Sequence, residues 1–204
     1  LLPQLLQKRQ FNYKNGVQGL RLILWGMFKK VVIADSIAPL VNEIYRDYNY
    51  LDGGVLILGA IYFAFQIYCD FSGYSDIAIG TAKLFGIEIK SNFNFPFFSR
   101  NIVEFWRRWH ISLTNWFTEY LFLPLKIKYR NSNQVVNLGI HFLYFCLIGL
   151  WHGANWTHVF FGIMHGIYFL PTLYNPMFFK IKTKQVAENA ILPSLIEFTQ
   201  IVVT

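Results

Sequence analysis

The stretch Leu138–Leu170, LGIHFLYFCLIGLWHGANWTHVFFGIMHGIYFL, decides the fold of this chain. It consists of two apolar runs without Lys, Arg, Asp or Glu, and the runs meet at the sequence WHG, residues 151–153. Gly153 can take a positive φ and end a helix, and Asn155 is a good N-cap for the next one. The pattern therefore predicts that His152 lies where one membrane helix ends and another begins. An ionisable side chain in such surroundings is a candidate functional residue.

The composition of the whole chain is that of a membrane protein. Of its 204 residues, 54% are hydrophobic and 19% aromatic, and the mean hydropathy is +0.35. Charged residues make up 14%, against about a quarter in a soluble domain. We therefore expect an all-α polytopic membrane protein that has the lipid bilayer as a partner. The first residue is Leu and the last residues are apolar, so we expect residues 1–204 to be one integral-membrane domain, an internal fragment of a longer chain.

The net charge of +7 is distributed as a membrane topology requires. Residues 1–16, 81–134 and 176–189 contain three, eight and three Lys or Arg residues, whereas 45–54 contains one. The positive-inside rule places the three basic segments in the cytoplasm, with two crossings before residue 81 and two between 135 and 175. This explanation takes precedence over nucleic-acid binding, and we expect no nucleic-acid partner.

The first two predicted spans carry charged residues. Lys29 and Lys30 lie in the middle of the first, 16–44, where they either line protein or water or reach out to the membrane interface. The second, 55–79, contains Asp70 and Asp76, for which we expect structural ion pairs. The nearby arginines predicted as their partners are Arg100, Arg107 and Arg108.

Glycine and proline punctuate the remaining segments. Gly73 and Gly80 are seven residues apart, so they share a helical face and permit a close helix contact. The sequence FNFPFF at 93–98 predicts a turn or extended piece. The aromatic spacing from Ile102 to Leu125 predicts one helix that lies in the interface or dips into the protein, with Pro124 closing it.

Three of the five histidines have a plain structural interpretation. His158 and His165 are seven apart on one helical face, and with His152 they could form a metal site. No HxxxH, HExxH or paired cysteine supports a metal, and Cys69 and Cys146 both lie in apolar runs, so we expect neither a metal nor a disulfide. We expect His141, His158 and His165 to be hydrogen-bonded to neighbouring helices.

The other two histidines each follow a tryptophan, in sequences that resemble a known family. EFWRRWHISLTNWFTEYLFLPL (104–125) and GLWHGANWTHVFFGIMHG (149–166) resemble the membrane-bound O-acyltransferase (MBOAT) family. YCDFSGYSDIAIG (68–80) and NFPFFSRNIVEFW (94–106) fit the same family, so the resemblance covers about residues 14–175. Within the family, the chain is most similar to the bacterial branch that O-acetylates alginate or peptidoglycan. It is more distantly similar to the branch that transfers D-alanine to teichoic acid.

The resemblance implies a bundle of membrane helices pierced by a central tunnel, in which two catalytic residues meet. The family's near-invariant histidine falls on His152, and its second polar site residue falls on His110. Trp151 and Asn155 are expected to line the site. His152 would be a general base and His110 would orient it or hydrogen-bond the carbonyl. A full crossing from residue 135 to 151, at about 1.5 Å per residue, would separate the two histidines, so we expect a tilted helix or a dip of 100–125.

The implied reaction is acyl transfer, with acetyl as the expected group, to a hydroxyl of a cell-surface polysaccharide in the bacterial cell membrane. The expected donor is acyl-CoA or an acyl-carrier thioester, with no bound cofactor, and an extracytoplasmic partner acyltransferase could complete the transfer. No GxSxG motif is present, which disfavours a serine acyl-enzyme. Two alternatives remain: D-alanyl transfer, and a transporter or channel with a histidine proton relay.

Overall fold

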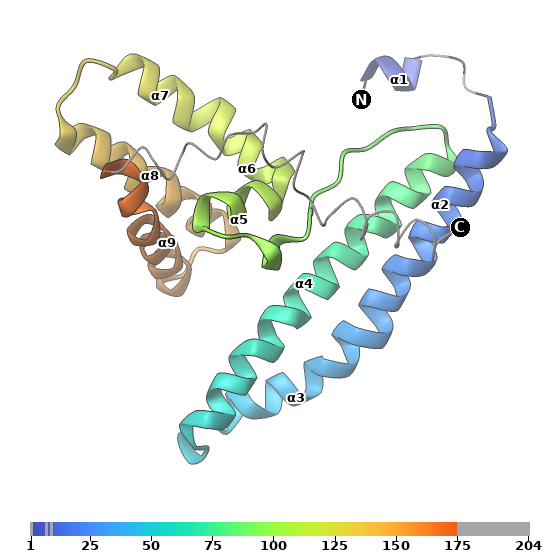
Figure 1. Cartoon of the computed structure of the whole chain (residues 1–204), viewed down its shortest axis with the longest axis horizontal. Coiled ribbons are helices and arrows are strands. Elements are labelled where there is room, and N and C mark those ends of the chain that lie inside the picture. Colours follow the sequence, from blue (N-terminus) through green and yellow to red (C-terminus); the bar gives the residue numbers. More distant parts are fainter. Residues whose placement is uncertain (1, 7, 9, 175–204) are drawn as a thin grey trace. The chain divides into compact units, whose positions relative to one another are not determined.

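A computed structural model describes residues 2–6, 8 and 10–174, and every regular element among them is helical. These residues form two compact units, the first ending at Asn94 and the second beginning at Phe95. Two described helices, α4 (Gly53–Leu84) and α8 (Gln134–His152), are long and apolar enough to cross a membrane (Figure 1). The predicted all-α fold class is confirmed, and the single domain over 1–204 stays a prediction.

The first unit is a helical hairpin in which one long helical arm packs along α4 (Figure 1). Its other elements are α1 (Leu2–Leu6), α2 (Tyr13–Met27), a π-helical segment (Phe28–Ala34), α3 (Asp35–Arg46) and a 3₁₀ turn (Tyr48–Tyr50). The backbone stays helical from α2 to α3. In the hairpin that this arm forms with α4, a side chain caps the N-terminus of each arm. Asn12 accepts a hydrogen bond from the Asn15 N–H at 3.2 Å, and Asp52 accepts from Gly54 and Val55 at the start of α4.

Four glycines bring α2 and α4 into direct backbone contact. A Cβ on Gly26 would lie 2.5 Å from the carbonyl oxygen of Gly73, and one on Gly19 would lie 2.6 Å from that of Gly80. The two glycines of each helix are seven residues apart, and the first glycine of α2 faces the second glycine of α4. The helices are therefore antiparallel and contact at two successive levels. The predicted role of Gly73 and Gly80 in a close helix contact is confirmed.

This contact predicts a large difference between two Gly→Ala substitutions. Gly73→Ala would place a methyl group against the Gly26 carbonyl oxygen, a backbone atom that cannot turn aside, and we expect a loss of about 1–3 kcal/mol. The matched control is Gly139→Ala in α8, where no atom of the described residues outside the helix's own nearby backbone lies within 4 Å of the new methyl group. Because alanine favours helix, this control should be neutral or stabilising by up to about 1 kcal/mol. Unfolding in detergent measures both, and equal stabilities would contradict the packing.

The lysines of the π-helical segment neutralise the aspartates of α4. Lys29 Nζ lies 2.7 Å from Asp76 Oδ2 and donates to Ser72 Oγ at 3.0 Å, and the lysine is only 8% exposed. Lys30 Nζ lies 2.7 Å from both Asp70 Oδ1 and Asp35 Oδ1. Structural ion pairs were expected here and are present.

The arginines predicted as partners of these aspartates were the wrong choice. Lysines forty or more positions earlier in the sequence fulfil that role, because the glycine contact brings the middle of the first arm against α4. Of the alternatives for Lys29 and Lys30, lining protein is therefore correct.

We expect Asp76→Ala to damage the protein more than Asp70→Ala. Removing Asp76 leaves the buried Lys29 ammonium without its counter-ion, a change that costs about 3–5 kcal/mol in comparable buried pairs. Lys30 is more exposed and keeps Asp35 when Asp70 is lost. The readouts are membrane protein level and melting temperature. The double variant Lys29→Met/Asp76→Leu removes both charges and should recover most of the loss. Normal expression of Asp76→Ala with lost activity would instead place this residue in a functional site.

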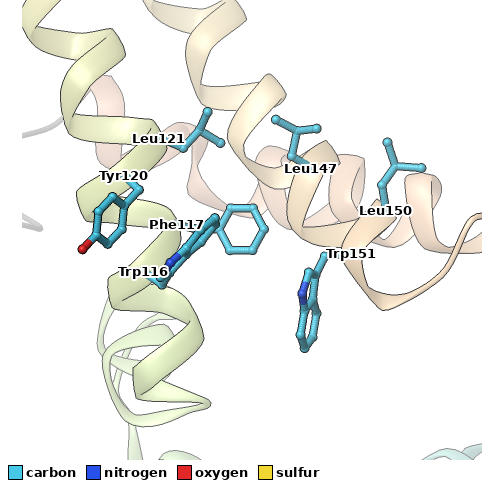
Figure 2. Close-up of a pocket in the computed structure, with 7 residues that line it drawn as sticks. All are labelled: Trp116, Phe117, Tyr120, Leu121, Leu147, Leu150 and Trp151. Atoms are coloured by element: carbon cyan, nitrogen blue, oxygen red, sulfur yellow. The ribbon is translucent and has the colours of Figure 1, made fainter. Parts of the chain in front are cut away.

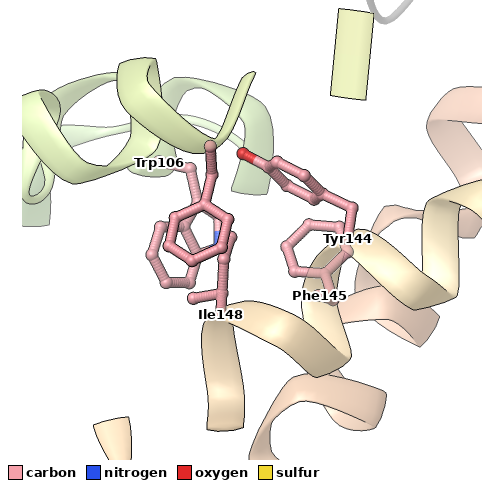
Figure 3. Close-up of a cluster of buried hydrophobic side chains, with 5 residues drawn as sticks. Trp106, Tyr144, Phe145 and Ile148 are labelled. Atoms are coloured by element: carbon pink, nitrogen blue, oxygen red, sulfur yellow. The ribbon is translucent and has the colours of Figure 1, made fainter. Parts of the chain in front are cut away.

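The second unit contains short helices that lead to a helical hairpin. Its elements are a 3₁₀ turn (Pro96–Phe98), α5 (Ile102–Arg108), α6 (Ile111–Phe117), a π-helical segment (Thr118–Phe122), α7 (Leu123–Lys128), α8 and α9 (Trp156–Tyr174). The predicted turn at 93–98 is confirmed. A buried cluster of Trp106, Phe117, Tyr144, Phe145 and Ile148 joins α5, α6 and α8 (Figure 3).

The predicted single helix over 102–125 is wrong in two places. It breaks at Trp109, which is extended, and His110, which is left-handed with φ 44° and ψ 53°. Pro124 does not close a helix but lies in the first turn of α7. The wider turn of the preceding π-helical segment leads directly into α7.

The α8–α9 hairpin is held together by backbone contact and one buried hydrogen bond. A Cβ on Gly149 would collide with the carbonyl oxygen of His158, and one on Gly162 with that of Phe145. His141, 4% exposed, donates from Nε2 to the carbonyl oxygen of Gly166 at 3.0 Å. The expectation that His141 is bonded to a neighbouring helix is confirmed.

Candidate active site

His110 lies at the break between α5 and α6. Two side chains cap the N-terminus of α5. Asn101 accepts from the Glu104 N–H at 2.8 Å, and Glu104 accepts from the Arg100 N–H at 3.0 Å. At its other end the chain turns through His110, which is buried, and α6 begins at the next residue. A left-handed conformation is uncommon for a residue other than glycine, and such strain clusters at functional sites.

His152 is the last residue of α8, as the sequence predicts. Its imidazole is exposed on the described chain and lies among rings rather than hydrogen-bonding side chains. The ring centroids of Trp151, Phe161 and His158 lie 5.0, 5.9 and 6.4 Å away. Asn155 caps α9 by accepting from the Thr157 N–H at 3.2 Å, which confirms its predicted capping position and explains its side-chain orientation.

The two candidate catalytic histidines come together through Trp151. The His110 ring packs against the Trp151 indole with centroids 5.8 Å apart, and His152 is the next residue along α8. Burial, and then the nearby charge of His152, lower the pKa of His110 to about 4. His110 is therefore neutral at neutral pH and offers an N–H donor and an acceptor rather than a positive charge. The tilted helix or dip of 100–125 that was expected to bring the two residues together stays a prediction.

An apolar groove of about 460 Å³ lies beside this pair. One wall comes from α6 and the following π-helical segment and the other from the end of α8 (Figure 2). Its lining residues are Trp116, Phe117, Tyr120, Leu121, Leu147, Leu150 and Trp151. Trp151 thus belongs both to the groove and to the contact with His110, whereas Asn155 does not line this groove.

Gly153 is required for a reason that the sequence does not reveal. Its φ of 167° is extended backbone that any residue adopts, so the expectation of a positive φ is wrong. A Cβ at this position would instead lie 2.7–2.8 Å from the imidazole of His158, which packs over the glycine and beside His152. Sequence reasoning assigned His158 a hydrogen-bonded structural role, but its described contacts are with rings.

The remaining histidine, His165, also departs from expectation. Its Nδ1 is buried and has no hydrogen-bond partner among the described residues, although a hydrogen bond to a neighbouring helix was predicted. Its ring contacts Phe161, Trp106 and Tyr168. Within residues 10–174, no three His, Cys, Asp or Glu side chains are grouped as metal ligands.

Glu104 of α5 forms ion pairs with Arg108, in the same helix, and with Arg100, which precedes it. The Arg108 guanidinium pairs with Glu104 Oε1 at 2.5 Å, and Arg100 Nε lies 3.5 Å from Glu104 Oε2. Burial alone would raise the pKa of the Glu104 carboxyl, but the Arg100 N–H and the Arg108 guanidinium lower it below its ordinary value. Arg107, between them, is exposed.

Comparison with known proteins identifies the family of this helical chain. The family model for membrane-bound O-acyltransferases matches residues 4–197. This chain therefore belongs to the membrane-bound O-acyltransferase family.

Its similarity to individual members agrees with this assignment. It is 40% identical over 172 residues to the peptidoglycan O-acetyltransferase of Helicobacter pylori, covering 82% of this chain and 32% of the relative. It is 41% identical over 169 residues to the probable alginate O-acetylase AlgI of Azotobacter vinelandii, covering 77% and 32%. The teichoic acid D-alanyltransferase of Streptococcus thermophilus is 33% identical over 160 residues, covering 74% and 38%. The chain spans about a third of the length of these relatives.

The contact between Gly153 and His158 predicts a displaced ring rather than an unfolded protein. In Gly153→Ala the new methyl group fits the backbone conformation but pushes the His158 imidazole away from His152. Because a side chain can turn aside, we expect a stability loss below about 1 kcal/mol.

The double variant Gly153→Ala/His158→Ala provides the control, because it contains no ring to displace. It should unfold at the same temperature as His158→Ala alone. A further loss in the double variant would show that the backbone itself requires glycine.

Proposed function

We propose that this chain is the part of an O-acyltransferase that carries its catalytic histidines, and that the group transferred is acetyl. The observation that supports this most directly is the meeting of His110, held in a left-handed break, with Trp151 and His152 at the end of α8. The Trp151 indole contacts both imidazoles, which come from segments about forty residues apart in the sequence. Similarity to enzymes named for peptidoglycan and alginate O-acetylation supports the acetyl group and a bacterial cell-surface polysaccharide as acceptor.

The proposed reaction needs a base and a group that stabilises an oxyanion. A neutral His152 imidazole takes the proton of the acceptor hydroxyl while the hydroxyl oxygen forms a bond to the thioester carbonyl carbon. The carbonyl oxygen then carries a negative charge, which the N–H of neutral His110 stabilises. The carbonyl reforms as the C–S bond breaks, and the departing thiolate takes the proton back from the His152 imidazolium. No covalent acyl-enzyme is needed.

The surroundings of the two histidines suit a thioester donor. The groove beside Trp151 is lined by aromatic and aliphatic side chains and would accommodate the apolar arm of a thioester. The exposed Arg107 and the basic segment 81–134 favour an anionic carrier such as CoA or an acyl-carrier phosphopantetheine. We propose that the full protein is a multi-pass protein of the bacterial cell membrane and that a partner acyltransferase outside the membrane could complete the transfer to the polysaccharide.

Two other functions give distinguishable results. D-alanyl transfer is supported by the similarity to teichoic acid D-alanyltransferases, and mild base would then release alanine instead of acetate from the modified polymer. A histidine proton relay in a transporter or channel would use the same imidazoles. In that case a His152 variant would lose transport of the acyl group rather than the transfer step.

We expect His152→Ala to abolish O-acyl transfer while the protein remains in the membrane. Loss of a general base typically lowers the rate by about 10²- to 10⁴-fold. The measurement is ester-linked acetate on the polymer, normalised to membrane protein level. His158→Gln is the matched control and should keep substantial activity, because its described role is ring packing. Near-normal transfer by His152→Ala would exclude this mechanism.

His110→Asn should retain more activity than His110→Leu. Asparagine tolerates the left-handed conformation of residue 110 and has an amide N–H that can replace the imidazole donor, whereas leucine lacks both properties. The same acetate measurement is used, with melting temperature as the control for strain at the break. Equal activities for the two variants would remove His110 from the reaction.

A further inference from the structure

Among the buried side-chain nitrogens of the second unit that have no hydrogen-bond partner among the described residues are two that belong to aromatic rings in contact with each other. They are Nε1 of Trp106 in α5 and Nδ1 of His165 in α9. The whole Trp106 residue is 6% exposed, so its indole N–H is shielded from solvent by the surrounding side chains. Buried polar atoms nearly always have a partner, and each exception requires an explanation.

The two rings that carry these nitrogens are in contact. The rings of Trp106 and His165 meet edge to face, with centroids 5.0 Å apart and an interplanar angle of 84°. They do not hydrogen-bond to each other. The neighbours of His165 on its own helix are the rings of Phe161 and Tyr168, at 4.4 and 6.0 Å. Both atoms therefore lie in an aromatic environment with no described group to satisfy either of them.

His141 in the same hairpin shows that an unsatisfied histidine is not a requirement of this packing. Its ring also lies among aromatic side chains, and its Nε2 donates to the Gly166 carbonyl oxygen, next to His165 in the sequence. The α8–α9 pair thus satisfies one buried imidazole through the backbone and leaves the other with an open nitrogen.

The open nitrogens lie beside the proposed catalytic residue. Phe161 contacts both His165 and His152, with centroid distances of 4.4 and 5.9 Å, so one phenyl ring separates the two histidines. The mechanism above uses neither Trp106 nor His165. They are linked to His152 through the Phe161 ring.

We propose that Trp106 and His165 form a polar subsite that binds one neutral oxygen atom of a substrate or of a water molecule that substitutes for it. An indole N–H can only donate, so its partner must be an acceptor, which excludes a cation. Imidazole Nδ1 donates or accepts according to its tautomer, so a carbonyl oxygen can accept from both rings, and a hydroxyl can accept from one and donate to the other. The aromatic surroundings favour a neutral group over an ion. If the bound oxygen atom belongs to a substrate, the subsite rests on the proposed acyl-transfer function. If it belongs to a water molecule, the subsite does not depend on that function.

The test removes each nitrogen while retaining an aromatic ring. Trp106→Phe and His165→Phe are compared in the full-length protein with Trp156→Phe, a matched control at a tryptophan that is 84% exposed. His165→Asn is the rescue variant, because its amide nitrogen and oxygen lie close to the position of Nδ1. His165→Gln reaches instead towards the position of Nε2. His165→Leu replaces His165→Phe if the larger ring impairs folding. The probes are acetyl-CoA and a soluble hydroxyl acceptor, and the readouts are kcat, KM for each substrate and melting temperature.

A substrate oxygen predicts that Trp106→Phe and His165→Phe raise KM for one substrate by about three- to tenfold, with an unchanged or higher melting temperature. A bound water predicts a lower melting temperature and unchanged KM values. In both cases His165→Asn should be closer to wild type than His165→Phe or His165→Gln. The proposal is overturned if the phenylalanine variants match Trp156→Phe in every readout, or if His165→Asn is no better than His165→Phe. Absence of acyl transfer by the wild-type protein would reject the proposed function, while the melting temperatures would still test the subsite.

Discussion

A helix satisfies the hydrogen bonds of its own backbone everywhere except at its ends and interruptions, and this constraint governs the whole of the described chain. Both units are helical almost throughout, so polar functional groups are concentrated where the helices stop. His152 occupies the end of α8, and His110 occupies a break between two short helices. The candidate site is therefore a meeting of two helix interruptions, brought together by the Trp151 indole.

The regular parts of this arrangement could be predicted from local residue types. The end of α8 at WHG, the capping of α9 by Asn155 and the close contact at Gly73 and Gly80 each depend on a property that one or two residues possess by themselves. Apolar runs of helical length likewise predicted α4 and α8, the two described helices that are long and apolar enough to cross a membrane. These features need no information about which distant segment packs against them.

The features that could not be predicted depend on packing between distant segments. The break at His110 has no glycine or proline to announce it, and the pattern of tryptophans continues across it. The partners of Asp70 and Asp76 were misassigned because proximity in sequence was used in place of the contact between α2 and α4. Gly153 was correctly placed at a helix end, but the group that requires glycine there is the imidazole of His158, five residues further along the chain.

The glycine contact of the first unit has a consequence for how α2 and α4 find their alignment. Two glycines seven residues apart on each helix form a repeating pattern, and a slide of seven residues would still bring one glycine opposite another. The apolar surface of α4 offers little to oppose such a slide. The Lys29–Asp76 pair does not repeat at that spacing, so only one alignment gives the buried Lys29 this counter-ion, whereas Lys30 keeps Asp35 in any alignment. The glycine contacts alone would permit more than one register of α2 against α4. The charges select one of them.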